Sequence, residues 1–254
     1  MLKVRIIPCL DVAGDVVVKG TQFGELRRLG DPADLAARYE DQGADEIVYL
    51  DITASIERRT PRMDVVERVA RRLSIPLTVG GGLETVDVVG AVLAAGADKV
   101  SLNTPAVARP ALVAEAAARF GSQAVVVAVD VRREAADWRV YVRGGRTPTD
   151  WFLEPWLRRV AELGAGEILL TSIDRDGMRQ GYDLEALAVA GRTVRLPIIA
   201  SGGGAAPEHL AAALAVPGVT GALIAGVLHD GATTVGRLKG DLQQWGVSIR
   251  GVEV

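Results

Sequence analysis

Two aspartates, Asp11 and Asp130, stand at matched places in the sequence where a carboxylate could do acid–base chemistry. Each follows a run of apolar residues, IIPCL before the first and VVVAV before the second. Such runs are typical of buried strands, and partial burial raises the pKa of a carboxyl group toward the range that suits proton transfer. A single aspartate in this setting could equally accept a strand-end hydrogen bond or cap a helix. The matched placement of two favours general acid–base catalysis.

Two glycine runs also occupy matched places, TVGGG at Thr78–Gly82 and ASGGG at Ala200–Gly204. Because glycine has no Cβ, a phosphate group can approach the backbone N–H groups of such a run. Tight packing at strand ends is the alternative explanation. Small or polar residues stand after the next apolar run in each case: Asn103 with Thr104, and Ala225 with Gly226. We therefore expect two phosphate sites, and a ligand with a phosphate at each end.

The matched places belong to an internal repeat. Pro76 and Pro197, which precede the glycine runs, are 121 residues apart, and GADEIVYLD from Gly43 matches GAGEILLTS from Gly164 at the same offset. The two aspartates are 119 residues apart, and a weaker match, GADKVSLNT to GVTGALIAG, has an offset of 122. A repeat of this length constrains the fold more than a single motif does. It predicts two copied halves, roughly residues 1–120 and 121–245.

The elements that must position these residues alternate along the whole chain. Eight short β-branched runs are each followed by a longer segment with helical spacing: VRIIPCL, EIVYLD, PLTVGG, KVSLN, AVVVAVD, EILLTS, PIIASGG and ALIAGV. One such segment begins with Asp31 as the expected N-cap and Pro32 at the first helical position. Eight strand–helix units in about 250 residues predict an α/β fold, a single-domain (β/α)8 TIM barrel over 1–254. The carboxyl ends of its strands would hold the reactive groups.

The composition narrows the functional classes. The net charge of −3 gives no electrostatic case for binding nucleic acid or an anionic membrane. Cys9 is the only cysteine, which excludes a disulfide framework, and neither His209 nor His229 stands in a ligand-like cluster. The apolar N-terminal stretch is too short and too interrupted for a signal peptide or a membrane span. We expect a cytoplasmic protein without a metal or cofactor.

Four charged residues stand near the starts of expected strands: Arg5, Glu46, Lys99 and Glu167. Period-two alternation along each strand points all four toward the barrel axis. Two positive and two negative charges there predict a ring that closes the lower end of the barrel. A purely structural salt-bridge plug is fully consistent with this pattern.

Together these motifs resemble one known family, the cyclase subunit of imidazole glycerol phosphate synthase in histidine biosynthesis. The resemblance rests on CLDV, VVKG, DITAS, TVGGG, ADKVSLNT, GSQAVVVAVD, GAGEILLTSIDRDG and IIASGGG, and it extends to LKGDLQQWGVSIR near the C-terminus. It implies a bisphosphate substrate, an aminoimidazole carboxamide ribonucleotide joined by a formimino link to phosphoribulose. Ammonia would attack this substrate, and cyclisation with cleavage would give imidazole glycerol phosphate and aminoimidazole carboxamide ribonucleotide.

The resemblance implies roles for individual residues. Asp11 and Asp130 would be the general acid–base pair. Lys19 would bind substrate from a long loop, residues 11–31, whose glycines at 14, 20, 24 and 30 would permit closure. Asp51 and Asp176, apart from the resemblance, are secondary candidates that we expect to orient substrate hydroxyls rather than to transfer protons. The remaining substrate-binding and phosphate-binding positions are Gly82, Asn103, Thr104, Thr171, Gly177, Ser201, Gly202, Gly203, Ala225 and Gly226.

One position departs from the family pattern. Gly226 stands where a serine is expected, so one hydroxyl contact to phosphate is lost while the backbone N–H remains.

The resemblance also implies a partner. The four charged residues at the base would form a gate for ammonia delivered by a glutaminase subunit, with Asp98 touching that partner in a heterodimer. Two alternatives stay open. One is the related phosphoribosyl isomerase of the same pathway, which also uses two aspartates in a duplicated barrel. The other is a non-catalytic phosphate-binding barrel, which leaves the paired aspartates unexplained.

Overall fold

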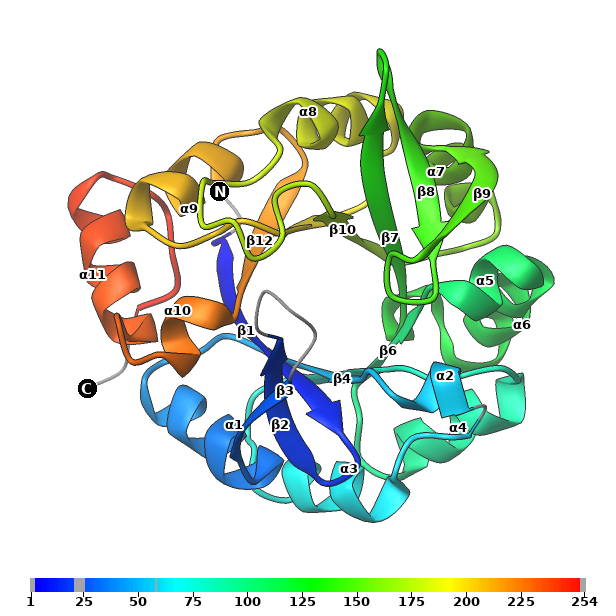
Figure 1. Ribbon diagram of the computed structural model, residues 1–254, viewed down its shortest axis with the longest axis horizontal. Helices are drawn as coiled ribbons and strands as arrows, with labels where there is room; N and C mark the ends of the chain where they lie inside the picture. The colour runs from blue at the N-terminus through cyan, green and yellow to red at the C-terminus, as the bar shows by residue number, and fades with distance from the viewer. Residues whose placement is uncertain (1–2, 21–25, 58, 252–254) are drawn as a thin grey trace.

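Eight parallel strands close into a barrel in the computed structural model, which describes residues 3–20, 26–57 and 59–251. The barrel strands are β1 (Arg5–Ala13), β4 (Ile47–Asp51), β5 (Leu77–Gly80), β6 (Lys99–Leu102), β7 (Val125–Glu134), β10 (Glu167–Ser172), β11 (Ile198–Ser201) and β12 (Val219–Ile224). Parallel pairing runs around the ring, and the β7–β10 pair completes it (Figure 1). The predicted (β/α)8 barrel is confirmed.

Helices surround the strands as an outer ring (Figure 1). They are α1 (Pro32–Asp41), α3 (Met63–Ala70), α4 (Val86–Ala94), α6 (Ala111–Phe120), α7 (Leu153–Glu162), α8 (Leu184–Thr193), α9 (Pro207–Leu214) and α11 (Val235–Gln244), with the short helices α2 (Ala54–Glu57), α5 (Thr104–Ala108) and α10 (Gly226–His229) and a 3₁₀ turn, η1 (Ser122–Ala124). Asp31 caps α1 as predicted, because its carboxylate accepts the Ala33 N–H at 2.8 Å. None of the described helices is long and apolar enough to cross a bilayer.

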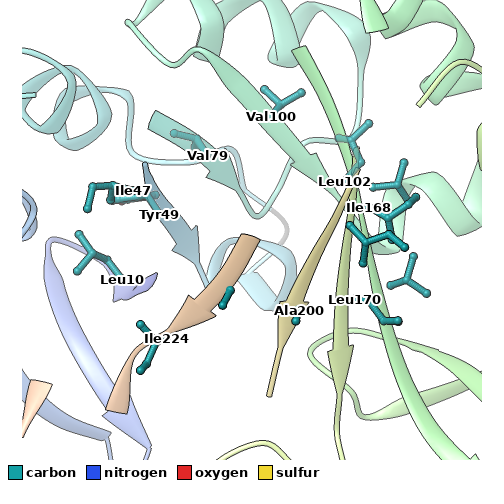
Figure 2. Packing of buried hydrophobic residues seen from close by; sticks show 14 of the residues in the cluster. Leu10, Ile47, Tyr49, Val79, Val100, Leu102, Ile168, Leu170, Ala200 and Ile224 are labelled. Carbon is teal, nitrogen blue, oxygen red and sulfur yellow. The ribbon is translucent and has the colours of Figure 1, made fainter. Parts of the chain in front are cut away.

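Two hydrophobic layers follow from the period-two alternation of the strands. Side chains such as Leu10, Tyr49 and Leu170 pack between the sheet and the helices (Figure 2). The alternate residues fill the barrel interior: Ile7, Cys9, Val48, Val126, Leu169, Ile199 and Leu223. Because the middle of the barrel is packed with apolar side chains, polar chemistry is confined to its two ends.

Two antiparallel extensions rise from opposite sides of the barrel (Figure 1). After β1 come β2 (Val16–Gly20) and β3 (Leu26–Gly30), so the segment expected to be a long loop is largely a β-hairpin. Gly24 lies outside the described residues. After β7 come β8 (Asp137–Val142) and β9 (Thr147–Phe152), which the sequence analysis did not predict. The equivalent placement of the two extensions supports the interpretation of a repeated half-barrel.

The glycine runs have a steric cause, the tight packing at strand ends that the sequence offered as the alternative to phosphate binding. Gly81 has φ +100°, and a Cβ there would lie 2.2 Å from the carbonyl oxygen of Asp51 on the neighbouring strand. Gly202, at the matched place, has φ +88°, and its Cβ would lie 2.6 Å from the carbonyl oxygen of Ser172. The end of the neighbouring strand therefore lies against the backbone of each glycine run and leaves no room for a side chain. The need for glycine does not by itself argue for phosphate.

Gly81→Ala should destabilise the fold by about 3 kcal/mol or more, because the new methyl group meets rigid backbone in addition to the left-handed strain. Gly246→Ala is the matched control, since Gly246 also has positive φ but open space around it. Urea unfolding of both variants measures the difference. Equal losses of about 1 kcal/mol would show that the Asp51 contact has no energetic consequence.

Candidate active site

Asp11 and Asp130 lie at the C-terminal mouth of the barrel. Both stand before the last residue of their strands, because β1 and β7 continue into the antiparallel extensions. Both side chains are only partly exposed. Asp11 lies 3.9 Å from the Cys9 thiol, and Asp130 accepts a hydrogen bond from the Asn103 amide at 3.3 Å. Each aspartate is thus one of the alternate residues of its strand whose side chains face the barrel axis.

Their electrostatic environment favours proton exchange near neutral pH. Burial raises the pKa of Asp11 to about 6 and that of Asp130 to about 7, from an ordinary value of 3.8. The negative charge of Asp176 is the second cause in both cases. The expected direction of both pKa shifts is confirmed. When two carboxyl groups have pKa values in this range, one can donate a proton while the other accepts one.

Asp176 has a stronger electrostatic link to Asp11 and Asp130 than the sequence indicated. It follows β10, in the turn of the TSIDRDG motif, and its carboxylate acts on both Asp11 and Asp130. Its place in the sequence predicts only a secondary role, the orientation of substrate hydroxyls. In the fold it is a third carboxyl group whose charge helps keep the other two protonated.

Asp51 is held by a residue that the sequence analysis missed. Its side chain is buried, and its two carboxylate oxygens accept from Arg59 at 2.6 and 2.9 Å. One of the oxygens also accepts the Ala54 N–H at 3.0 Å. Through these hydrogen bonds the Asp51 carboxylate stabilises the turn from β4 into α2. The structure gives Asp51 a structural task beside the expected contact with substrate.

The residues expected to bind phosphate gather at the same mouth in two groups. Thr104 begins α5 and Gly226 begins α10. The residues before them, Asn103 and Ala225, have similar backbone angles of −117°/−90° and −136°/−72°. The second group continues along the ends of β10 and β11 and the segments that follow them: Thr171, Gly177, Ser201, Gly202 and Gly203. In the first group, Gly82 follows β5 beside α2.

Lys19 reaches the second group from strand β2. Its ammonium lies 2.6 Å from the Asp230 carboxylate and donates to the Gly226 carbonyl at 3.3 Å. Arg179, from the segment between β10 and α8, also pairs with Asp230. Neither Arg179 nor Asp230 stands out in the sequence, because both are common surface residue types in turns.

The four charged residues at the base form a closed ring. Arg5 pairs with Glu46 at 2.9 Å and with Glu167, and Lys99 pairs with the same two glutamates at 3.0 and 2.9 Å. The predicted ring geometry is confirmed. Asp98, beside the ring, is exposed and accepts the Leu77 N–H at 2.8 Å. Both a plug and a gate remain compatible with the ring.

Within the described residues, no group of His, Cys, Asp and Glu side chains is arranged to hold a metal ion. A closed (β/α)8 barrel with two acids of raised pKa at its C-terminal mouth has the features of a barrel enzyme that moves protons.

Comparison with known proteins specifies the family. The family described as "Histidine biosynthesis protein" matches residues 5–234. The imidazole glycerol phosphate synthase subunit HisF of Myxococcus xanthus is 53% identical over 250 residues, which cover 98% of this chain and 99% of that protein. The HisF proteins of Metallosphaera sedula and Synechococcus sp. CC9311 are 51% and 52% identical over 246 and 258 residues, covering 97% and 100% of this chain and 98% of each relative. The chain belongs to this family of histidine-biosynthesis proteins.

Proposed function

We propose that this chain is the cyclase subunit of an imidazole glycerol phosphate synthase. It uses ammonia and the formimino-linked bisphosphate substrate to make imidazole glycerol phosphate and aminoimidazole carboxamide ribonucleotide, with release of one water. The observation that carries the proposal is the identity of about half of all residues, over nearly the full length, with proteins of that name. A cytoplasmic location fits a biosynthetic subunit of this kind.

Asp11 and Asp130 are the proposed acid–base pair. Addition of ammonia requires the attacking nitrogen to lose protons, and cleavage requires the departing amine to gain one. Two carboxyl groups with pKa values of about 6 and about 7 can accept the first protons and supply the second. The substrate would lie across the mouth, with one phosphate near Gly82, Asn103 and Thr104 and the other near Gly203 and Gly226.

The test is an assay of the purified chain with synthetic bisphosphate substrate and ammonium salt at alkaline pH, where neutral NH₃ is present. We expect cyclisation products without a metal or cofactor. Conversion of the ribosyl isomer of the substrate, with no cyclisation, would instead support the isomerase. Binding of the substrate with no turnover would support a non-catalytic barrel.

The ring at the base is the proposed entrance for ammonia from a glutaminase subunit docked on the N-terminal face. Arg5, Glu46, Lys99 and Glu167 surround the barrel axis there, and exposed Asp98 stands beside them. Apolar side chains such as Val48 and Leu169 separate the ring from the aspartates. The ring therefore lies too far from the mouth to take part in the chemistry directly.

Lys99→Ala should lower glutamine-dependent turnover at least about tenfold more than ammonia-dependent turnover, because it opens the ring without touching the mouth. The measurement compares both reactions in the complex with the glutaminase subunit. The ammonia reaction is the internal control for folding. Equal losses in the two reactions would indicate a structural plug.

A further inference from the structure

Asp230 joins two cationic side chains that come from widely separated segments. The carboxylate Oδ2 lies 2.6 Å from the Lys19 ammonium and also pairs with the guanidinium of Arg179. Lys19 belongs to β2 in the first half of the chain, and Arg179 follows β10 in the second half. One carboxylate between two cations leaves this cluster with a net positive charge.

The two cations converge on the space above Gly226. A Cβ built on Gly226 would lie 3.7 Å from the Lys19 ammonium nitrogen and 3.9 Å from an Arg179 guanidinium nitrogen. These are ordinary contact distances, and Gly226 has no positive φ, so neither a clash nor the backbone conformation demands glycine there. The position where a serine hydroxyl was expected is thus flanked by two positive groups.

Arg179 occupies this place at a conformational cost. Its φ is +58°, in the left-handed region that favours glycine and that a residue with a side chain adopts only at a cost in free energy. Non-glycine residues held in this region cluster at ligand-binding sites, where the surrounding structure enforces the conformation. The Asp230 contact is one such constraint on Arg179.

Asp230 is itself held in place by its neighbour. His229, the last residue of α10, lies with its Nδ1 2.6 Å from the Tyr39 hydroxyl of α1. Burial lowers the pKa of His229 to about 4, so the ring is neutral and adds no third charge to the cluster. This contact joins the end of α10 to α1, next to the carboxylate that pairs with Lys19 and Arg179.

We propose that Arg179 is a further phosphate-binding residue, which contacts a phosphate monoester of the substrate beside Gly226, and that Asp230 positions Arg179 and Lys19 for this contact. The proposal rests on the proposed function for the identity of the substrate. A planar guanidinium can donate two parallel hydrogen bonds to a phosphate. It would replace the hydroxyl contact that Gly226 lacks.

The first test is steady-state kinetics of the ammonia-dependent reaction. Arg179→Gln should raise KM for the bisphosphate substrate about tenfold, the scale of one charge-assisted hydrogen bond. Its kcat should stay within about a factor of two, because a contact remote from the reacting atoms acts equally in the ground state and transition state. Arg195→Gln removes the same charge from an exposed arginine at the opposite end of the barrel and should leave both constants unchanged.

The role of Asp230 has its own variants. Asp230→Asn should raise KM about threefold to tenfold, since Lys19 and Arg179 lose the charge that gathers them, and Asp230→Glu should restore much of the loss. A lower KM in Asp230→Asn would overturn the positioning role, because it would mean that the carboxylate competes with phosphate. A reduced thermal midpoint with an unchanged KM in Arg179→Gln would overturn the binding role and leave a structural ion pair.

A binding experiment separates this inference from the proposed function. Inorganic phosphate, titrated into the chain alone and followed by calorimetry, should bind more weakly to Arg179→Gln than to the wild type or Arg195→Gln. Absence of cyclisation by the wild type would contradict the proposed function and leave this comparison intact. Equal phosphate binding by all three proteins would contradict the inference, whatever the assay shows.

Discussion

Asp130→Asn should lower turnover of the ammonia-dependent reaction by about 10²-fold or more, the usual scale for losing a positioned acid–base group. The amide is nearly isosteric with the carboxyl group but cannot exchange a proton near neutral pH. Asp11→Asn should have an effect of the same order, because both side chains face the same mouth with raised pKa values. Steady-state kinetics with saturating ammonia measures both. Near-normal turnover by either variant would remove that residue from the mechanism.

Stability supplies the control for this prediction. The pKa of Asp130 rises on folding from 3.8 to about 7, so between these values the folded state holds a proton that the unfolded chain releases. Stability therefore falls as pH rises through this window, and the ionised carboxylate destabilises the fold above it. At pH 8, Asp130→Asn should be more stable than the wild type by about 1 kcal/mol or more. At pH 4 the difference should vanish. Urea unfolding at the two pH values tests this, and a less stable variant at pH 8 would mean that its lost turnover reflects damage to the fold.

Lys239→Ala should destabilise the protein by about 3–5 kcal/mol, because it leaves a buried carboxylate without its partner. The Lys239 ammonium lies 2.8 Å from an Asp45 oxygen, and the two residues are 1% and 5% exposed. The other Asp45 oxygen accepts the N–H of Ile6 at 2.8 Å, so the carboxylate cannot turn toward water without breaking the start of β1. The pair attaches α11, near the end of the chain, to the first two barrel strands.

Arg237→Ala is the matched control, since Arg237 is an exposed cation on the same helix. Its removal should change the free energy of unfolding by no more than about 0.5 kcal/mol. Urea unfolding of both variants at neutral pH measures the difference. A loss below about 1 kcal/mol for Lys239→Ala would indicate that water enters and solvates Asp45.

Patterns in the sequence determined the barrel of this protein, but not its two antiparallel extensions. The eight apolar runs predicted the eight barrel strands because a strand covered on both faces reads as continuously apolar. The offset of 121 residues between the two glycine runs predicted equivalent halves, and period-two parity predicted the ring of Arg5, Glu46, Lys99 and Glu167. The position of Asp11 and Asp130 at the carboxyl ends of their apolar runs predicted that both lie at one mouth of the barrel. These features could be predicted because they follow from sequence patterns that recur every two residues, once per strand–helix unit or once per half of the chain.

Only the tertiary structure decided which groups act on one another. No sequence pattern indicates three of these interactions: the effect of the Asp176 charge on Asp11 and Asp130, the hydrogen bonds from Arg59 to Asp51, and the burial of Lys239. For the same reason, the sequence alone did not decide whether packing or phosphate binding requires the glycine run beside Asp51. Its crowding comes from a strand 30 residues earlier in the chain. Electrostatic and steric contacts depend on distance in space, and closing the barrel brings together residues such as Lys19 and Asp230, 211 positions apart.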